Sequence, residues 1–270
     1  MPIASIVDRS KPVSRVPVVM LLLACTSLLF SANQAPAQTH ISKAAETEPA
    51  SALVMAFVGG FVHSDDLRHP EVRLAQRLQA ASGDGVQVRV FKNRERGKAH
   101  KTIVEWLNGF KTSTETGKKR PVPRIILFGH SWGASAVVYL ARELERDGIP
   151  VSLTILVDSV RRSGEDDSVI PANVAEAVNF YQSKGIIHGR SKIMAADPAR
   201  TAVLGNFRFE YEKVPAECHA YPWYARLFLK GHLSIECDPR VWSLVETLIE
   251  DRLAARLQSE QPEVAAPPVD

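Results

Sequence analysis

The chain has 270 residues, with 33 lysines and arginines against 30 aspartates and glutamates and a formal net charge of +3. An excess of positive charge this small gives no reason to expect a nucleic-acid partner. The three cysteines form neither a CxxC motif nor a cluster with histidines, so the sequence predicts no metal site and no cofactor.

The N-terminal segment has the order of a secretory signal. Basic residues precede an apolar run at 18–30, VVMLLLACTSLLF, and a small-x-small site ends at Ala37. This run is shorter than the roughly 20 residues that span a bilayer. We therefore expect residues 1–37 to be removed and the protein to be exported, either to the periplasm or as a secreted protein.

Two alternatives keep the N-terminal segment at a membrane. In one, the apolar run is retained as an anchor; in the other, LLAC at 22–25 acts as a lipobox and Cys25 carries a lipid. The apolar residues that follow Cys25 argue against the lipobox. In both cases the chain reaches the membrane only through this segment, and the sequence predicts no oligomeric state.

The rest of the chain divides into one domain and two flanking segments. Residues 38–50 and 258–270 are polar or rich in Pro and Ala, which is typical of a disordered linker and a disordered tail. Residues 51–257 have the length of one α/β domain.

Apolar runs alternate with helical patterns along this domain. Short runs bounded by Gly and Pro predict strands at 52–58, 86–91, 124–129, 151–158 and 202–211. Apolar residues at helical spacing predict helices that begin at Pro70, surround Trp106, follow Ser131 and begin at Pro239, and a further helix around Ala172–Gln182. The alternation predicts a doubly wound, mainly parallel sheet of about five or six strands flanked by helices, with the first strand between the second and the third.

A candidate nucleophile follows the third predicted strand. Gly129-His130-Ser131-Trp132-Gly133 matches the G-x-S-x-G pattern of a nucleophile elbow, with a strand before it and a helix after it. Glycines suit an elbow because larger side chains there would collide with the adjacent strand and helix. The alternative is an ordinary strand-to-helix turn. We favour the nucleophile because this turn lies at the carboxyl edge of the sheet, where α/β proteins bind ligands.

A serine nucleophile needs a base and an orienting acid, which follow it in the order acid, then histidine. Asp158 ends the fourth predicted strand at the same sheet edge, and His232 lies in a predicted loop just before the final helix. The alternatives are an aspartate that only caps a turn and a histidine on the surface. Further candidates are Asp166, Asp167 and Asp197 for the acid, and His219 and then His188 for the base.

Two backbone N–H groups are expected to bind the oxyanion. One belongs to Trp132, which follows the nucleophile. The other belongs to Phe61 or Gly60 in the loop VGGF after the first strand. The alternative for VGGF is a plain glycine turn.

This set of residues resembles the α/β-hydrolase superfamily over about residues 52–253. ILVDSV at 155–160 is similar to the corresponding stretch of the thioesterase domains of peptide and polyketide synthases, in which the acid follows the strand after the nucleophile helix. The resemblance implies Ser131 as nucleophile, Asp158 as acid and His232 as base. The chain departs from the family in its GG oxyanion loop, where HG is common.

The sequence therefore predicts an exported serine hydrolase that cleaves small or lipid-like carboxylic esters or thioesters through an acyl-serine. The alternatives are a long-chain lipase and a catalytically silent binding protein with the hydrolase fold. Inserts at 161–200 and 213–231 are expected to cover either an acyl chain or only the sheet. The charged run at 92–101 either attracts an anionic group or is a solvated loop. Cys218 and Cys237 either form a disulfide, as export permits, or remain buried thiols.

Overall fold

The computed structural model describes residues 51–112, 122–162, 164 and 166–259. The predicted signal peptide, Cys25, the linker and nearly all of the predicted tail lie outside these residues. Among the described helices, none combines the length and the apolar character that a membrane span requires.

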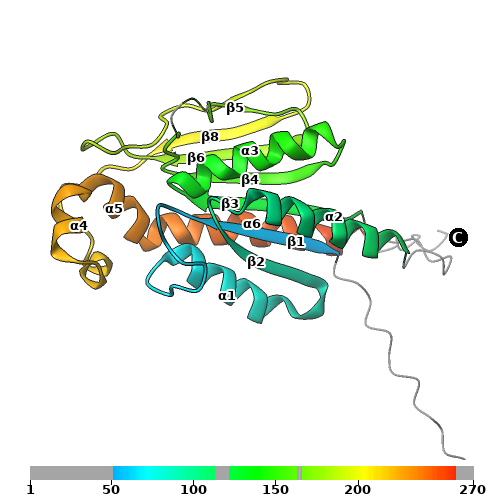
Figure 1. The fold of residues 1–270 in the computed structure, drawn as a ribbon, viewed down its shortest axis with the longest axis horizontal. Coiled ribbons are helices and arrows are strands. Elements are labelled where there is room, and N and C mark those ends of the chain that lie inside the picture. The colour runs from blue at the N-terminus through cyan, green and yellow to red at the C-terminus, as the bar shows by residue number, and fades with distance from the viewer. Residues whose placement is uncertain (1–50, 113–121, 163, 165, 260–270) are drawn as a thin grey trace, which may run out of the picture. The chain divides into compact units, whose positions relative to one another are not determined.

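A six-stranded sheet forms the centre of the domain, with strand order β2-β1-β3-β4-β6-β8 (Figure 1). Every neighbouring pair in this sheet is parallel. The strands are β1 (Ala52–Val58), β2 (Val86–Lys92), β3 (Arg124–His130), β4 (Val151–Val157), β6 (Val174–Tyr181) and β8 (Ala202–Arg208). Two short strands, β5 (Val169–Ile170) and β7 (Met194–Ala195), pair with each other separately.

Helices cover both faces of the sheet and one of its edges. The helices are α1 (Pro70–Ser82), α2 (Arg96–Thr112), α3 (Trp132–Arg146), α4 (Trp223–Phe228), α5 (Lys230–Cys237) and α6 (Pro239–Ser259), with the short turns η1 (Gly83–Gly85) and η3 (Ala216–Ala220). Apolar side chains of α2 and α3 pack on one face of β1 and β3, and those of α1 and α6 pack on the other face.

The central strands are apolar along their whole length because both of their faces are buried. Every residue of β1 is buried. Successive residues alternate between the two cores: Leu53, Met55 and Phe57 belong to one, and Val54 and Ala56 to the other. A strand buried in this way has a continuous apolar sequence, as the pattern of ALVMAFV predicted.

The predicted fold class is confirmed, and β1 lies between β2 and β3 as expected. The helix predicted around Ala172–Gln182 is wrong, because that segment forms β6 between β4 and β8. Val174, Ala177, Val178 and Phe180 are buried on the two sides of the strand, so their spacing fits either a helix or a strand covered on both faces. Pairing with two parallel neighbours decides the outcome in favour of the strand.

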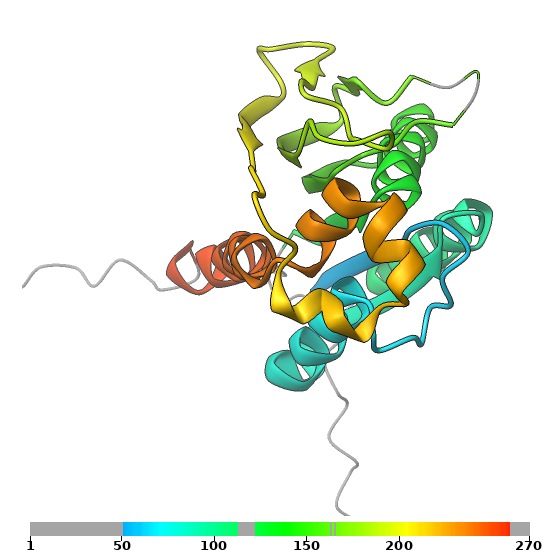
Figure 2. The same ribbon diagram turned by 90° about the vertical axis from the view of Figure 1, so that its left-hand side faces the viewer.

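The carboxyl ends of the parallel strands lie together at one edge of the sheet. The helices α4 and α5 and the turn η3 cross this edge, at the left in Figure 1 and facing the viewer in Figure 2. The loops that follow β1, β3, β4 and β6 therefore meet beneath α5. This is the edge at which open α/β sheets bind ligands.

Candidate active site

Ser131 sits in a sharp turn between β3 and α3. Its backbone has φ 57° and ψ −125°, an unusual conformation for a residue other than glycine. A Cβ atom on Gly133 would lie 2.1 Å from the Phe57 carbonyl oxygen, and one on Gly129 would lie 2.7 Å from the Gly133 carbonyl carbon. Glycine at both positions therefore lets α3 start directly against β1, which lifts Ser131 to the sheet edge.

Three side chains from distant parts of the chain form a hydrogen-bonded series at this edge. The Ser131 hydroxyl lies 2.9 Å from His232 Nε2, and His232 Nδ1 lies 2.6 Å from Asp158 Oδ2. Because an ionised carboxylate only accepts hydrogen bonds, Nδ1–H donates to Asp158, and Nε2 is left to accept from the serine. His232 was expected in a loop, but it lies in the first turn of α5.

Asp158 is held by hydrogen bonds that sequence reasoning missed. Gln182 donates its backbone N–H to Oδ1 at 3.1 Å and its side-chain amide to Oδ2 at 3.0 Å. The Gly189 N–H donates to Oδ1 at 2.8 Å. Burial opposes ionisation of Asp158, but the hydrogen bonds from His232 and Gln182 outweigh it, so the pKa lies below its ordinary value. The carboxylate is thus charged and fixed in orientation next to the imidazole.

The loop after β1 approaches the start of α3 from the other side. Gly60 has φ +43°, and the Val62 N–H donates to the Gly59 carbonyl at 3.2 Å, which closes a turn. The Phe61 ring is 79% exposed and meets the Trp132 ring edge-on, with centroids 5.7 Å apart. The loop predicted to supply one oxyanion donor therefore lies beside the residue predicted to supply the other.

The charged run at 92–101 helps to shape this loop. The Asn93 side-chain amide donates to the carbonyl oxygens of Val58 and Gly60 at 3.2 and 2.6 Å. The Arg162 guanidinium donates to the Asn93 side-chain oxygen and lies over the Trp132 ring. Arg94 from the same run lies over the Phe61 ring of this loop, 5.1 Å from its centroid, and most of the remaining run forms the first turns of α2.

The other candidate acids and bases lie away from Ser131. Asp167 is buried but binds Ser159 and Arg190, and Asp166 is exposed and also binds Arg190. Asp197 accepts a hydrogen bond within its own turn. His188 and His219 are exposed. The structure brings none of these residues into hydrogen-bond contact with Ser131 or His232.

A second buried polar layer lies beneath the Ser131 series. The His130 ring stacks on the His232 ring with centroids 4.6 Å apart. Burial lowers the pKa of His130 to about 4, so this imidazole is neutral. His130 Nδ1 lies 3.8 Å from the Glu236 carboxylate, which accepts hydrogen bonds from His69 at 2.6 Å and Tyr221 at 2.8 Å. Sequence reasoning did not identify His69, Glu71 or Glu236.

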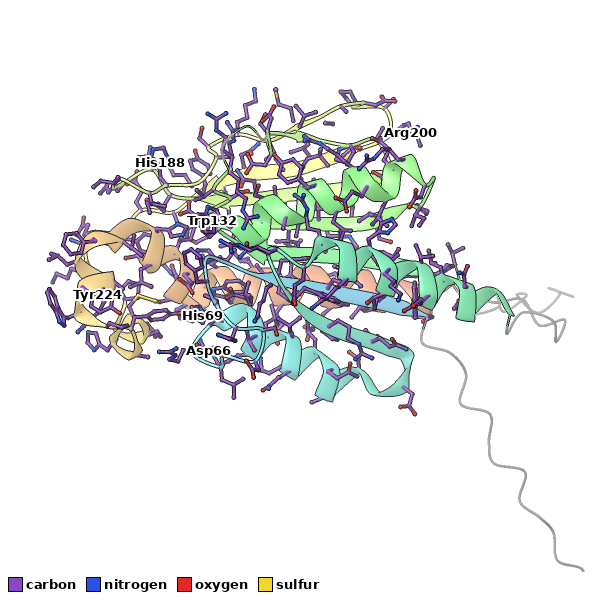
Figure 3. The ribbon with its side chains drawn as sticks, in the orientation of Figure 1. Asp66, His69, Trp132, His188, Arg200 and Tyr224 are labelled. Atoms are coloured by element: carbon purple, nitrogen blue, oxygen red, sulfur yellow. A yellow bond between two sulfur atoms is a disulfide. The ribbon has the colours of Figure 1, made fainter. Side chains whose placement is uncertain are left out.

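A disulfide and an exposed apolar surface lie over the sheet edge. Cys218 in η3 and Cys237 at the end of α5 form the disulfide. The short helix α4 exposes four large side chains, Trp223, Tyr224, Leu227 and Phe228, each to at least 54%. Figure 3 shows Tyr224 at the same end of the domain as Trp132, His188, His69 and Asp66, whereas Arg200 lies at the opposite end.

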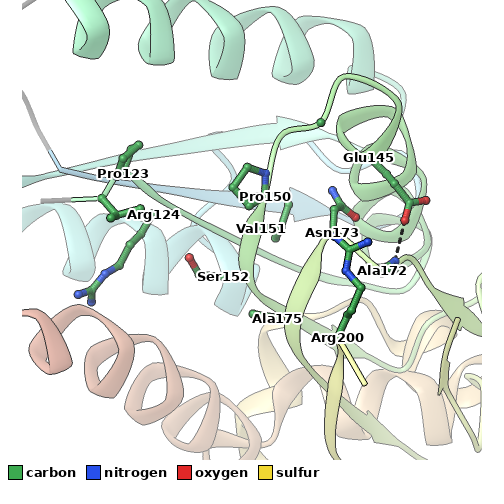
Figure 4. A pocket seen from close by; sticks show the side chains of 12 residues that line it. Pro123, Arg124, Glu145, Pro150, Val151, Ser152, Ala172, Asn173, Ala175 and Arg200 are labelled. Atoms are coloured by element: carbon green, nitrogen blue, oxygen red, sulfur yellow. Dashed lines mark hydrogen bonds between the residues drawn. The ribbon is translucent and has the colours of Figure 1, made fainter. Parts of the chain in front are cut away.

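A hollow lies at the opposite end of the sheet, and none of its lining residues belongs to the series of Ser131, His232 and Asp158. It is lined by residues at the amino ends of β3, β4 and β6, including Arg124, Val151, Asn173 and Arg200 (Figure 4). Glu145 lies at its rim and accepts a hydrogen bond from the Ala172 N–H at 2.7 Å. The amino ends of parallel strands are not where open α/β sheets place their ligands, so we assign the hollow no role.

The chain has an α/β-hydrolase-like fold, as its strand order and its elbow define it. No protein-family model and no curated protein matches the chain. A thioesterase from the prodiginine pathway of Streptomyces coelicolor shares 14% identity over 82% of this chain and 97% of its own, with a TM-score of 0.38. Human thioesterase 2 shares 11% identity over 79% of this chain and 100% of its own, with a TM-score of 0.40. A cutinase-like protein from Cryptococcus sp. shares 13% identity over 76% of this chain and 96% of its own, with a TM-score of 0.39. Likenesses this distant assign no residue and no substrate to this chain.

Proposed function

We propose that this protein is a serine hydrolase of carboxylic esters or thioesters, with Ser131 as nucleophile, His232 as general base and Asp158 as the orienting acid. The observation that carries the proposal is the continuous hydrogen-bonded series from the Ser131 hydroxyl through both ring nitrogens of His232 to Asp158. A serine at an elbow is a weak nucleophile by itself, and this arrangement is the one that activates it.

The reaction follows from the positions of the atoms. His232 Nε2 takes the proton of Ser131 as Oγ attacks the carbonyl carbon of the substrate. The charged Asp158 stabilises the imidazolium that forms, and the imidazolium then gives its proton to the leaving alcohol or thiol. Water attacks the resulting acyl-serine with His232 again accepting a proton, which releases the acid and restores Ser131.

The developing oxyanion needs two N–H donors. We assign them to Trp132, at the amino end of α3, and to Phe61 or Gly60 in the facing loop. Removing one such donor from a serine hydrolase typically lowers kcat by about 10²–10³. The Asn93 amide, which binds the Gly60 carbonyl, orients this loop. It is a positioning residue and does not touch the substrate.

Covalent labelling tests the proposal directly. A fluorophosphonate should label the wild-type protein at Ser131, as peptide mass spectrometry can show, and should not label Ser131→Ala. The same variant should lose kcat for short-chain nitrophenyl esters by a factor on the order of 10⁴ or more. Absence of labelling and of turnover in the folded wild type would favour a catalytically silent binding protein.

A second candidate, a long-chain lipase, is favoured by the apolar surface of α4 next to the site. An enzyme that takes long acyl chains from a lipid surface exposes such side chains, because they bind the apolar part of the substrate or its surface. Rates measured with esters of increasing chain length, below and above the concentration at which the substrate aggregates, distinguish the two. A rate that rises sharply on aggregation indicates the lipase.

Export of the protein is part of the proposal. It is supported by the basic, apolar and small-residue order of residues 1–37 and by the disulfide between Cys218 and Cys237, since disulfides persist in oxidising compartments. Intact-mass measurement of the protein from the periplasm or culture medium distinguishes cleavage after Ala37 from lipidation at Cys25. A full-length mass in the membrane fraction would indicate a retained anchor.

A further inference from the structure

The buried layer beneath Ser131 contains a cluster of three side chains with metal-binding atoms. His69 precedes α1, Glu71 lies in the first turn of α1, and Glu236 lies in α5. One ligand atom of each lies within 4.8 Å of the others. Figure 3 labels His69 and Asp66 close together, at the end of the domain that also carries Tyr224. None of the three residues has a part in the proposed ester chemistry.

Glu71 is the unexplained member of this cluster. Its side chain is fully buried, and neither carboxylate oxygen has a hydrogen-bond partner among the described residues. The N–H groups of Gly59 and of Glu71 itself are the backbone groups near it, but neither makes a hydrogen bond of normal geometry. A buried carboxyl group without a partner destabilises the folded state, so a missing partner at this position would stabilise the fold.

Charge points to a cation as that partner. Glu71 and Glu236 bring two carboxyl groups together in a buried space. In the described part of the chain, histidines are the only basic side chains at ion-pair distance from Glu236, and no basic side chain lies at that distance from Glu71. The nearby arginines are engaged elsewhere: Arg68 binds Asp66, and Arg73 binds backbone carbonyls. A divalent ion would balance both carboxylates at once.

We propose that His69, Glu71 and Glu236 bind a divalent transition-metal ion, for which Zn²⁺ is the best fit. One imidazole and two carboxylates suit Zn²⁺ and other first-row ions, whereas Ca²⁺ takes six to eight oxygen ligands. Ligand atoms around a tetrahedral Zn²⁺ lie about 3.4 Å apart. The three ligand atoms lie within 4.8 Å of one another, and Zn²⁺ would replace the 2.6 Å hydrogen bond between His69 Nδ1 and Glu236.

The surroundings match those of a metal-binding histidine. His69 Nδ1 points at Glu236, and His69 Nε2 lies 3.9 Å from the Asp66 carboxylate on its other side. A metal-ligating histidine usually donates its second N–H to a carboxylate. Asp66 lies on that side of the His69 ring, at ion-pair distance and not yet at hydrogen-bond distance. Tyr221 donates to Glu236 Oε1 and would hold that ligand in place. The ion would tie the start of α1 to α5, which carries His232, so its role is structural.

The test measures metal content and stability rather than turnover. Full-length protein is purified without a metal-affinity step, dialysed against a chelator and titrated with ZnCl₂. We expect a single tightly bound Zn²⁺ per chain by elemental analysis and a rise in Tm that saturates with Zn²⁺. Co²⁺ at the same site should give visible absorption bands. Ser131→Ala should bind Zn²⁺ like the wild type, so the result is independent of the proposed ester hydrolysis.

A variant and a matched control locate the ion. Glu71→Gln keeps the shape of the side chain and removes a ligand charge, so it should lose the bound Zn²⁺ and the Zn²⁺-dependent rise in Tm. Glu246→Gln should keep both, because Glu246 forms an ordinary ion pair with Arg77 on the surface. The proposal is overturned if chelated wild type gains no stability and no bound ion from Zn²⁺ or Co²⁺. It is equally overturned if Glu71→Gln binds Zn²⁺ as tightly as the wild type.

Discussion

Gly133 is the position at which the elbow should tolerate the least change. A Cβ atom there would lie 2.1 Å from the Phe57 carbonyl oxygen, 2.6 Å from the Phe57 carbonyl carbon and 2.9 Å from the Val58 carbonyl oxygen. Ordinary contact begins at 3.4 Å, so α3 and β1 must separate by about 1.3 Å before alanine fits. All three atoms belong to the backbone of a buried strand, so no side-chain rotation relieves the clash.

We therefore expect Gly133→Ala to be strongly destabilising. Overpacking a core costs about 1–3 kcal/mol, and backbone collisions put this change at the upper end. A loss of about 3 kcal/mol corresponds to a decrease in Tm of roughly 6–12 °C in a domain of this size. Fluorophosphonate labelling should also slow, because the start of α3 positions both Ser131 and the Trp132 N–H.

Gly97 in α2 supplies the matched control, since a Cβ atom on it meets nothing within 4 Å. Gly97→Ala should leave the free energy of unfolding unchanged or raise it by up to about 1 kcal/mol, because alanine loses less entropy than glycine in a helix. Urea unfolding and thermal melts of both variants measure the difference. A Gly133→Ala protein within about 0.5 kcal/mol of the wild type would refute the close packing of α3 on β1.

Three further outcomes follow from the contacts around the site. Gln182→Ala should lower kcat roughly ten- to hundredfold with little change in KM, because a hydrogen bond to a charged group contributes about 1.5–3 kcal/mol. An unchanged kcat would show that Asp158 needs no such support. Folding lowers the pKa of Asp158, so its contribution to stability is present above the unfolded value of about 3.9 and is lost as the pH falls through the folded pKa. As the pH is lowered from about 6 to about 3, the urea midpoint should therefore fall less steeply in Asp158→Asn than in the wild type. The exposed Asp84→Asn is the control and should match the wild type. Parallel curves for all three proteins would contradict the assignment. Reducing the disulfide between Cys218 and Cys237, which are 19 residues apart, should lower the free energy of unfolding by about 3 kcal/mol, and an unchanged Tm after verified reduction would show that the bridge does not limit stability.

The sheet and the positions of Ser131 and Asp158 could be predicted because local sequence determines them. Strands buried on both faces are continuously apolar, and the elbow requires small residues at fixed spacing. Asp158 directly follows such a strand, so its place at the sheet edge follows from the strand itself. These features need no knowledge of which distant segments meet.

The errors and omissions have a different origin. The spacing of apolar residues in β6 fits two structures, and only its neighbours β4 and β8 decide between them. Gln182 and Gly189 support Asp158 from the segment after that strand, and the wrong helix hid the role of Gln182. His69 and Glu71 flank a proline at a helix start and look like solvent-exposed residues. Their burial depends on α5, which comes about 160 residues later in the chain.

Helix α5 connects the two layers of the site. His232 and Glu236 are four residues apart on it, so their side chains lie on the same face of the helix. His232 reaches Ser131 and Asp158 at the sheet edge, while Glu236 reaches His69 near the start of α1. His130, which immediately precedes Ser131, stacks on His232 and faces Glu236, so it contacts both layers. Whatever holds Glu236 in place therefore also fixes the rotation of α5, and with it the distance between His232 and the serine hydroxyl.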